Sequence, residues 1–517
     1  MMVRNNISVG LKIMKILKII ICVFFLIAEI FCIKAIPVLK ATFPLENTDA
    51  VMFTLSQNVE GSRDFVIALF MATFKNAVIL SGFLVLIVVV ALWSFRFFCN
   101  RGAFKLKYIP SYVSLIVMLN LVCLLLLAKC VYSELPVIDY YVAWKDSIAV
   151  PGHSEFYQKE YVSPDSVQIE FKEKKNLILI FLESMEYNFQ DYANGGNHPE
   201  NLIPEITEYI KNEQSFVPGG VQVAGMGWTI ADVVAKTCGI PLIFPPSIRN
   251  NVKKMEIFLP GVTCLTDILI DNGYNVIVSK GANLKFSDMD AFLTSHSSPL
   301  AFGLMEYLKD KPRIKDGAVS EWGVKDSMHY ELVKEHIEKI SKQNKPWALW
   351  FFTVNTHTPL GILDSTCGIP QDVSELERLP SIIRCSSRQL DNFIKWARNQ
   401  EWFDNTVIAV MGDHAMMAAP EFVGFKETNF THYWLDFFIN SSKIAENRKR
   451  SFTSLDMFPT ILEAIGAGGF DGSLGLGRSL YYSKPTLLEL YGVDSLNKVL
   501  GKRSVESDFF HFLERRR

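Results

Sequence analysis

The stretch that decides the fold is NLILIFL at residues 176–182, which is followed directly by Glu183 and Ser184. A continuous apolar run of this length is typical of a strand that is buried on both faces. Similar runs follow at NVIVS (275–279), WALWFFTV (347–354) and TVIAVM (406–411), with helical stretches between them. Strands that alternate with helices predict an α/β domain with a mostly parallel central sheet.

Polar side chains stand where these predicted strands end. Glu183 follows the first strand, His357 the third, and Asp413 and His414 the fourth. We expect them at one edge, because open α/β sheets gather their chemistry at the carboxyl ends of the strands. Each could alone be a cap or a surface charge. Together, Glu183, Asp413 and His414 form an oxygen, oxygen and nitrogen donor set that suits one Mn²⁺, Mg²⁺ or Zn²⁺ ion.

A nucleophile is suggested by the segment GMGWTIA at residues 225–231. Its glycines predict a turn that opens a helix, with Thr229 near the helix N-terminus. The free backbone N–H groups at that end favour an anion such as a phosphate. Thr229 could simply cap the helix. Beside a metal site, its hydroxyl could instead lose its proton and attack phosphorus, giving a phospho-threonine.

The chain before this domain is predicted to be a membrane anchor. Three apolar segments, at about 19–39, 77–95 and 109–128, are long enough to span a bilayer as helices. Residues 1–135 carry 13 basic and 6 acidic side chains, and the basic ones cluster before the first segment and between the second and third. The excess of basic residues in cytoplasmic loops then predicts a multi-pass protein whose large domain lies outside the cytoplasm.

Cysteine usage fits an exported domain. Cys238, Cys264, Cys367 and Cys385 are the cysteines that follow the anchor, and an even count in an oxidising compartment suggests two disulfides. Three pairings are compatible with four cysteines, and we favour the sequential one. The net charge of −2 gives no reason to expect nucleic acid as a partner.

Four elements occur in a characteristic order: FLES (181–184), GWTIA (227–231), GDH (412–414) and DMFPT (456–460). In this order they resemble the alkaline phosphatase/sulfatase superfamily, in its branch of lipoteichoic acid synthases and phosphoglycerol transferases. The resemblance covers about residues 170–480, and the upstream anchor suits the same branch. It implies an alkaline phosphatase-like fold and a metal-dependent transferase.

The resemblance also implies roles for single residues. Thr229 matches the nucleophile. Glu183, Asp413 and His414 match the metal ligands, with Thr229 completing the set around one ion, for which Mn²⁺ is expected and Mg²⁺ or Zn²⁺ also fits. His357 matches a histidine that contacts the phosphoryl group or the leaving oxygen. The implied donor is phosphatidylglycerol, with diacylglycerol as the leaving group and a periplasmic, glucan-like glycan as the acceptor, at the bacterial inner membrane.

The chain departs from the pattern of lipoteichoic acid synthases after Lys285-Phe286. Those enzymes continue with Trp-x-Arg, whereas this chain reads Ser287-Asp288-Met289. The difference favours transfer of a single unit over polymer synthesis. The Cys-x-Pro-x-Arg context of true sulfatases is absent from CGIPL at 238–242, which argues against sulfate ester hydrolysis. The further candidates for substrate contact are Trp228, Asn283, Trp322 and His432. His329 and His336 share a helix face that we expect to be solvated.

These assignments divide the chain into an anchor (1–131), a juxtamembrane connector (132–175), a catalytic domain (176–482) and a C-terminal tail (483–517). Two other functions stay open. One is phosphoethanolamine transfer to lipid A or a glycan. The other is a catalytically silent envelope assembly protein, which the presence of a nucleophile and all three ligand types argues against.

Overall fold

The computed structural model describes residues 2–42, 63–100, 111–148, 150–243, 257–304, 320, 322–358, 360–417, 420–427 and 429–512. The chain forms two compact units that divide between Tyr141 and Val142. The basic residues Arg101, Lys105 and Lys107, which contribute to the predicted topology, lie outside the described residues.

The first unit is built from three long helices. They are α1 (Met2–Thr42), α3 (Arg63–Asn100) and α4 (Tyr112–Glu134). Their segments Ile16–Lys40, Thr73–Ser94 and Tyr112–Glu134 are long and apolar enough to cross a membrane, which confirms the three predicted apolar helices. A small core of Leu26, Ile30, Ala77 and Cys123 joins them. Large apolar side chains elsewhere on the helices are exposed, as expected of surfaces that face lipid.

The second unit contains a six-stranded sheet in the order β5-β4-β6-β2-β7-β9. The strands are β2 (Asn176–Leu182), β4 (Asn275–Lys280), β5 (Leu300–Gly303), β6 (Trp347–Phe352), β7 (Thr406–Gly412) and β9 (Asp436–Ile439). The first five run parallel, and β9 pairs antiparallel with β7. The predicted mostly parallel sheet is therefore confirmed.

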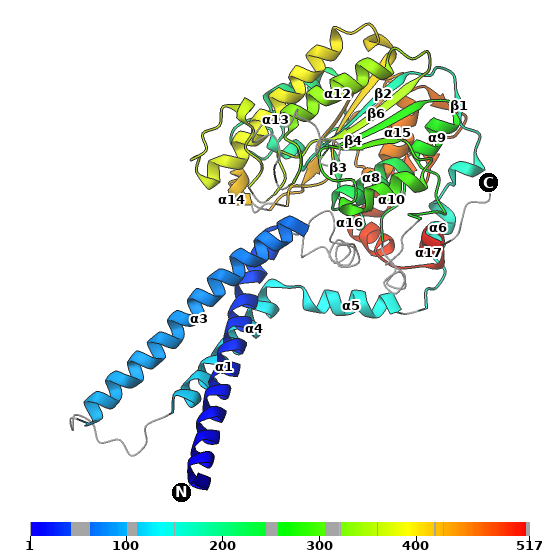
Figure 1. Ribbon diagram of the computed structural model, residues 1–517. Helices are drawn as coiled ribbons and strands as arrows, with labels where there is room; N and C mark the ends of the chain where they lie inside the picture. Colours follow the sequence, from blue (N-terminus) through cyan, green and yellow to red (C-terminus); the bar gives the residue numbers. More distant parts are fainter. Residues whose placement is uncertain are drawn as a thin grey trace. The chain divides into compact units, whose positions relative to one another are not determined.

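Both faces of the sheet are covered by helices (Figure 1). Leu177, Leu179 and Phe181 pack on one face, while Ile178, Ile180 and Leu182 pack on the other, as expected of alternating side chains. One face is covered by α8 (Thr229–Cys238), α9 (Leu265–Asp271), α10 (Met289–Ser295) and α15 (Met457–Ala464), and the other by α7 (Pro204–Asn212), α12 (Asp326–Ile340) and α13 (Glu375–Arg398).

The core of the second unit extends beyond the boundaries predicted from sequence. Segments placed in the connector and the tail form α6 (Glu155–Glu160), α16 (Leu487–Leu500) and α17 (Val505–Phe512). They bury Tyr157, Leu496 and Phe510 against the same face as α8. In addition, β1 (Glu170–Phe171) pairs with β10 (Ala467–Gly468). This packing could not be predicted from the sequence, because the partners of these helices are distant in the chain.

The remaining described α-helices and β-strands are not part of this sheet. They are α5 (Val137–Ile148), α14 (Pro420–Val423), β3 (Gly220–Val221), β8 (Tyr433–Trp434), β11 (Ser473–Leu474) and β12 (Gly477–Arg478). Of these, β3 pairs antiparallel with β8, beside the strand end that carries Gly412.

Candidate metal centre and active site

Three ligand-type side chains converge where β2 and β7 end. One ligand atom each from Glu183, Asp413 and His414 lies within 4.8 Å of the other two, and all three residues are buried. His414 Nε2 lies 3.6 Å from Glu183 Oε1 and 3.4 Å from Asp413 Oδ2. The structure therefore brings together the three residues that the sequence analysis selected as ligands.

The backbone at these strand ends is shaped to hold the cluster. A Cβ on Gly412 would lie 2.0 Å from the Met185 carbonyl oxygen, so only glycine fits at this close approach. Ser184 takes a left-handed φ of 51°, and its N–H donates to Asp413 Oδ1 at 2.7 Å. Strain of this kind is retained where surrounding contacts fix the conformation, which is common at functional sites.

The donor set fits a cation. His414 Nδ1 lies 2.9 Å from the Ala415 carbonyl oxygen, and since a carbonyl only accepts, Nδ1 carries the proton. A neutral ring then directs the Nε2 lone pair at two carboxylates, an arrangement that a bound metal ion satisfies. Burial and the adjacent Asp413 raise the pKa of Glu183. Burial opposes charge on His414, but Asp413 and Glu183 raise its pKa, with a net rise. The two carboxylates therefore stabilise a positive charge at this position.

His357 lies within electrostatic range of this cluster. Burial lowers its pKa to about 4, while the charges of His414 and Asp413 act on it in opposite directions. Its Nδ1 donates to the Thr358 carbonyl oxygen at 2.8 Å, which leaves Nε2 as an acceptor. The Trp322 ring stacks on the imidazole, and Phe286 meets Trp322 edge-on. Of the predicted substrate residues, Trp322 is thus joined to the candidate site.

Thr229 is the first residue of α8, and Trp228 is its N-cap residue. Thr229 is half-buried and Trp228 is buried. The same helix reaches the metal cluster through Lys236, whose Nζ donates to the carbonyl oxygens of Gly412 and Asp413 at 2.8 and 3.0 Å. The nucleophile candidate therefore stands on a helix that is fixed directly to the turn of two candidate metal ligands, Asp413 and His414.

The other two substrate candidates have different surroundings. Asn283 Oδ1 accepts from the Lys285 N–H at 2.8 Å, so this amide closes a local turn. His432 Nδ1 lies 2.9 Å from both carboxylate oxygens of the fully buried Glu186. Burial lowers and Glu186 raises the pKa of His432, with a net rise. The histidine side chain remains 34% exposed.

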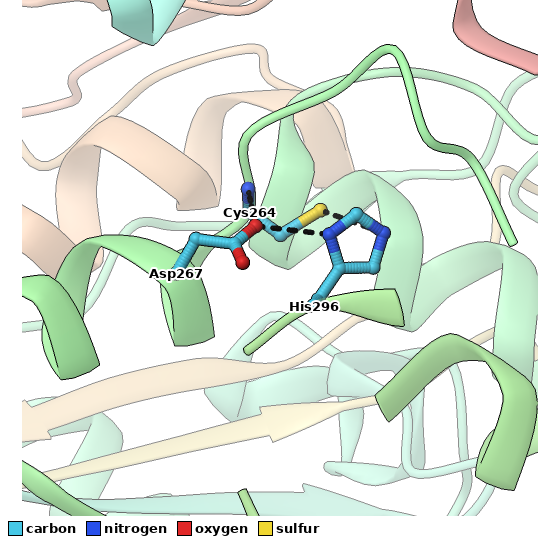
Figure 2. Close-up of side chains that lie close together, drawn as sticks. All are labelled: Cys264, Asp267 and His296. Carbon is cyan, nitrogen blue, oxygen red and sulfur yellow. Dashed lines mark hydrogen bonds and ion pairs between the residues drawn. The ribbon is translucent and has the colours of Figure 1, made fainter. Parts of the chain in front are cut away.

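A second cluster of ligand types lies on another part of the domain, between α9 and α10. His296 Nδ1 lies 2.9 Å from Asp267 Oδ2, and its Nε2 lies 3.8 Å from Cys264 Sγ (Figure 2). Although the atoms are close enough to hold an ion, Cys264 Sγ is bonded to Cys238. A disulfide sulfur is not the thiolate that a metal requires, so the first cluster is the better metal site.

The four cysteines that follow the predicted anchor are paired in sequence order. Cys238 is bonded to Cys264, and Cys367 is bonded to Cys385. Cys238 is the last residue of α8, so the first disulfide joins the helix of Thr229 to the start of α9.

Sequence reasoning missed several residues around the site. Lys236, Asp232 and Glu186 are fully buried charged residues, and an Asp–Lys pair four positions apart usually indicates an exposed helix face. The prediction that His329 and His336 are solvated is wrong: both are buried on α12, whose inward face they share with Val333 and Ile337. No signal in the sequence distinguishes these positions.

Comparisons with known proteins agree with this geometry. The sulfatase family model matches residues 175–467. The chain is 32% identical over 315 residues to phosphoglycerol transferase I of Escherichia fergusonii, covering 59% of this chain and 39% of the relative. It is 29% identical over 356 residues to phosphoglycerol transferase I of Xanthomonas campestris, covering 68% and 47%. The chain thus spans less than half the length of these relatives.

A solved structure shares the fold. The lipoteichoic acid synthase LtaP of Listeria monocytogenes superimposes with a TM-score of 0.50 at 14% identity, over 73% of this chain and 99% of that one. Since the family model covers more than half of the chain, this protein belongs to the sulfatase family.

Proposed function

We propose that this protein is a membrane-anchored phosphoglycerol transferase. It moves a glycerophosphoryl group from phosphatidylglycerol to Thr229, releases diacylglycerol, and then passes the group to a periplasmic, glucan-like glycan. The observation that carries the proposal is the convergence of Glu183, Asp413 and His414 at the strand ends, beside a turn to which Lys236 links α8, the helix that begins at Thr229. The names of the relatives at about 30% identity support the choice of glycerophosphate.

Four residues of the site would bind the metal ion. Glu183, Asp413 and His414, with the Thr229 hydroxyl, would hold one divalent ion, for which we favour Mn²⁺ over Mg²⁺ or Zn²⁺. A bound ion would supply positive charge against the phosphoryl oxygens, which phosphoryl transfer needs more than covalent chemistry. The free backbone N–H groups at the N-terminus of α8 can also stabilise negative charge on a phosphoryl group.

His357 is suited to contact the reacting group as a neutral side chain. With a pKa of about 4, His357 is neutral at pH 7, and its free Nε2 can accept a hydrogen bond from a hydroxyl group. Trp322 fixes the plane of this ring. We assign His357 to the contact with the phosphoryl group or the leaving oxygen, and Trp228, Asn283, Trp322 and His432 to the walls that bind donor and acceptor.

The membrane location follows from the anchor. We infer a multi-pass protein of the inner membrane, with the catalytic domain in the periplasm, where its two disulfides are stable. An anchored domain meets phosphatidylglycerol at a high effective concentration, because donor and enzyme share one surface.

The test is turnover of defined lipids by the full chain. Vesicles of phosphatidylglycerol or of phosphatidylethanolamine are incubated with the reconstituted protein, Mn²⁺ and a soluble glucan, and released diacylglycerol is measured. Release from phosphatidylglycerol should fall at least about a thousandfold in Thr229→Ala and stay near wild type in Thr237→Ala, a matched change on the same helix. Release from phosphatidylethanolamine alone would refute the glycerophosphate assignment in favour of phosphoethanolamine transfer. Release from neither lipid would favour a silent protein.

A further inference from the structure

Helix α8 carries a charged pair with no contact to solvent. Asp232 and Lys236 are both fully buried, four residues apart, and they form an ion pair. They lie three and seven residues after Thr229, so all three side chains project from one side of the helix.

Lys236 uses its whole hydrogen-bonding capacity. Its Nζ donates to Asp232, to the Gly412 carbonyl at 2.8 Å and to the Asp413 carbonyl at 3.0 Å. Three acceptors match the three N–H groups of an ammonium, which shows that the lysine is charged. Nζ also lies 3.9 Å from the centre of the Trp434 ring, a cation–π contact that is strong when desolvated.

Asp232 links the helix to a second element. Its second oxygen, Oδ1, accepts from the Ser454 hydroxyl. Ser454 belongs to a short 3-10 helix, η10 (Ser454–Asp456), which is itself fixed by a capping box between Thr453 and Asp456. The pair therefore connects α8 to two independent elements, one of which is the turn that presents Asp413 and His414.

A stability role explains this arrangement poorly. Burying two charges costs more than their attraction returns in many proteins, and apolar replacements of similar volume are often neutral or stabilising. The pair does fix the position of α8 relative to the turn that carries Asp413 and His414, because Lys236 Nζ binds both the Gly412 and the Asp413 carbonyl oxygens. Thr229 lies about 10 Å along the same helix, so a shift at Lys236 displaces its hydroxyl.

We propose that Asp232 and Lys236 are a positioning pair that sets the register between the Thr229 hydroxyl and the metal ligands Asp413 and His414. The inference rests on the proposed function, since it concerns the geometry of that transfer. The pair is proposed to act through the position of α8.

The experiment replaces the pair without leaving an unpaired charge. In the full chain, Asp232→Leu with Lys236→Met should remain folded, although it leaves the Gly412 and Asp413 carbonyls and the Ser454 hydroxyl without these partners, and it should still retain one metal ion. Its kcat for diacylglycerol release should fall about 100-fold, the cost of misplacing a reacting group by about 1 Å, with KM for phosphatidylglycerol unchanged. The matched control is Glu160→Gln with Arg478→Met, another buried pair, which should keep the wild-type kcat.

The outcomes separate the two proposals. A folded double variant with wild-type kcat, or one whose loss lies in KM alone, overturns the positioning role. If the double variant does not fold, Ser454→Ala removes only the hydroxyl that holds Asp232; a kcat lowered about tenfold supports the role and a wild-type kcat overturns it. A wild-type chain that releases no diacylglycerol overturns the proposed function and this inference together.

Discussion

The indole ring of Trp322 stacks on the imidazole of His357, with ring centroids 3.9 Å apart and planes inclined by 23°. His357 is also held by the hydrogen bond from its Nδ1 to the Thr358 carbonyl. Two contacts thus fix one ring, and its free Nε2 can point in only one direction.

We predict that Trp322→Ala lowers kcat for diacylglycerol release about 3- to 10-fold, since an aromatic stack contributes about 0.5–1.5 kcal/mol. Trp322→Phe retains a stacking surface and should recover most of the loss. Steady-state kinetics of the full chain in phosphatidylglycerol vesicles measure both. If the alanine variant matches wild type, the stack does not orient His357 for the proposed reaction.

Metal content distinguishes the two clusters of ligand-type residues. We predict one divalent ion per chain, lost in Glu183→Gln because this ligand set has no substitute carboxylate at that position. Asp267→Asn is the matched control: it alters the cluster beside the disulfide and should leave the ion bound. Elemental analysis after dialysis measures both. Metal loss in the Asp267 variant, with retention in the Glu183 variant, would reverse the assignment of the two sites.

The disulfide between Cys238 and Cys264 closes a loop with a sequence separation of 26. Chain-entropy arguments give such a cross-link about 3–4 kcal/mol of stabilisation. The paired change Cys238→Ala with Cys264→Ala should lower the free energy of unfolding by this order in chemical denaturation. Peptide mapping without reductant should recover this link and the one between Cys367 and Cys385. Any other pairing would contradict the structure.

Acid sensitivity is expected from His329. The ring is buried beside Ser279, and burial lowers its pKa to about 3, whereas an unfolded histidine titrates near 6.5. Between these values the unfolded chain binds a proton that the folded chain excludes. Stability should therefore be complete above pH 6.5 and fall as the pH drops toward 3.

The matching variant is His329→Gln, which cannot take up this proton. Its unfolding free energy should depend less on pH over the same range, by up to about 1.4 kcal/mol per pH unit. Denaturant unfolding at several pH values measures the difference between the two slopes. If the unfolding free energies of wild type and variant depend on pH with the same slope, His329 is not the source of the acid sensitivity.

The central sheet could be predicted because its inner strands are buried on both faces. An unbroken apolar run as short as NLILIFL fits few structures besides a buried strand, and the residue after it lies at the strand end by necessity. Glu183, Asp413 and His414 could therefore be found from position and residue type alone. The edge strands β5 and β9 could not, because each is only four residues long.

The burial of charged and polar side chains could not be predicted from the sequence. Asp232 and Lys236 have the spacing of a solvated helix pair, and His329 and His336 have that of a polar helix face. The burial of Asp232 and Lys236 is decided by partners distant in the chain, Ser454 and Gly412, and that of His329 and His336 by residues such as Ser279 and Phe302. The same holds for α16 and α17, whose apolar side chains pack on a core formed by other segments.

The proposed transfer depends most on Thr229 as the nucleophile. The direct measurement is the intact mass of the purified full chain after incubation with phosphatidylglycerol and Mn²⁺, followed by peptide mapping. We predict a glycerophosphoryl adduct on Thr229 that is absent in Thr229→Ala and disappears when a glucan acceptor is added. Diacylglycerol release without any adduct, or an adduct on another residue that persists in Thr229→Ala, would contradict the account.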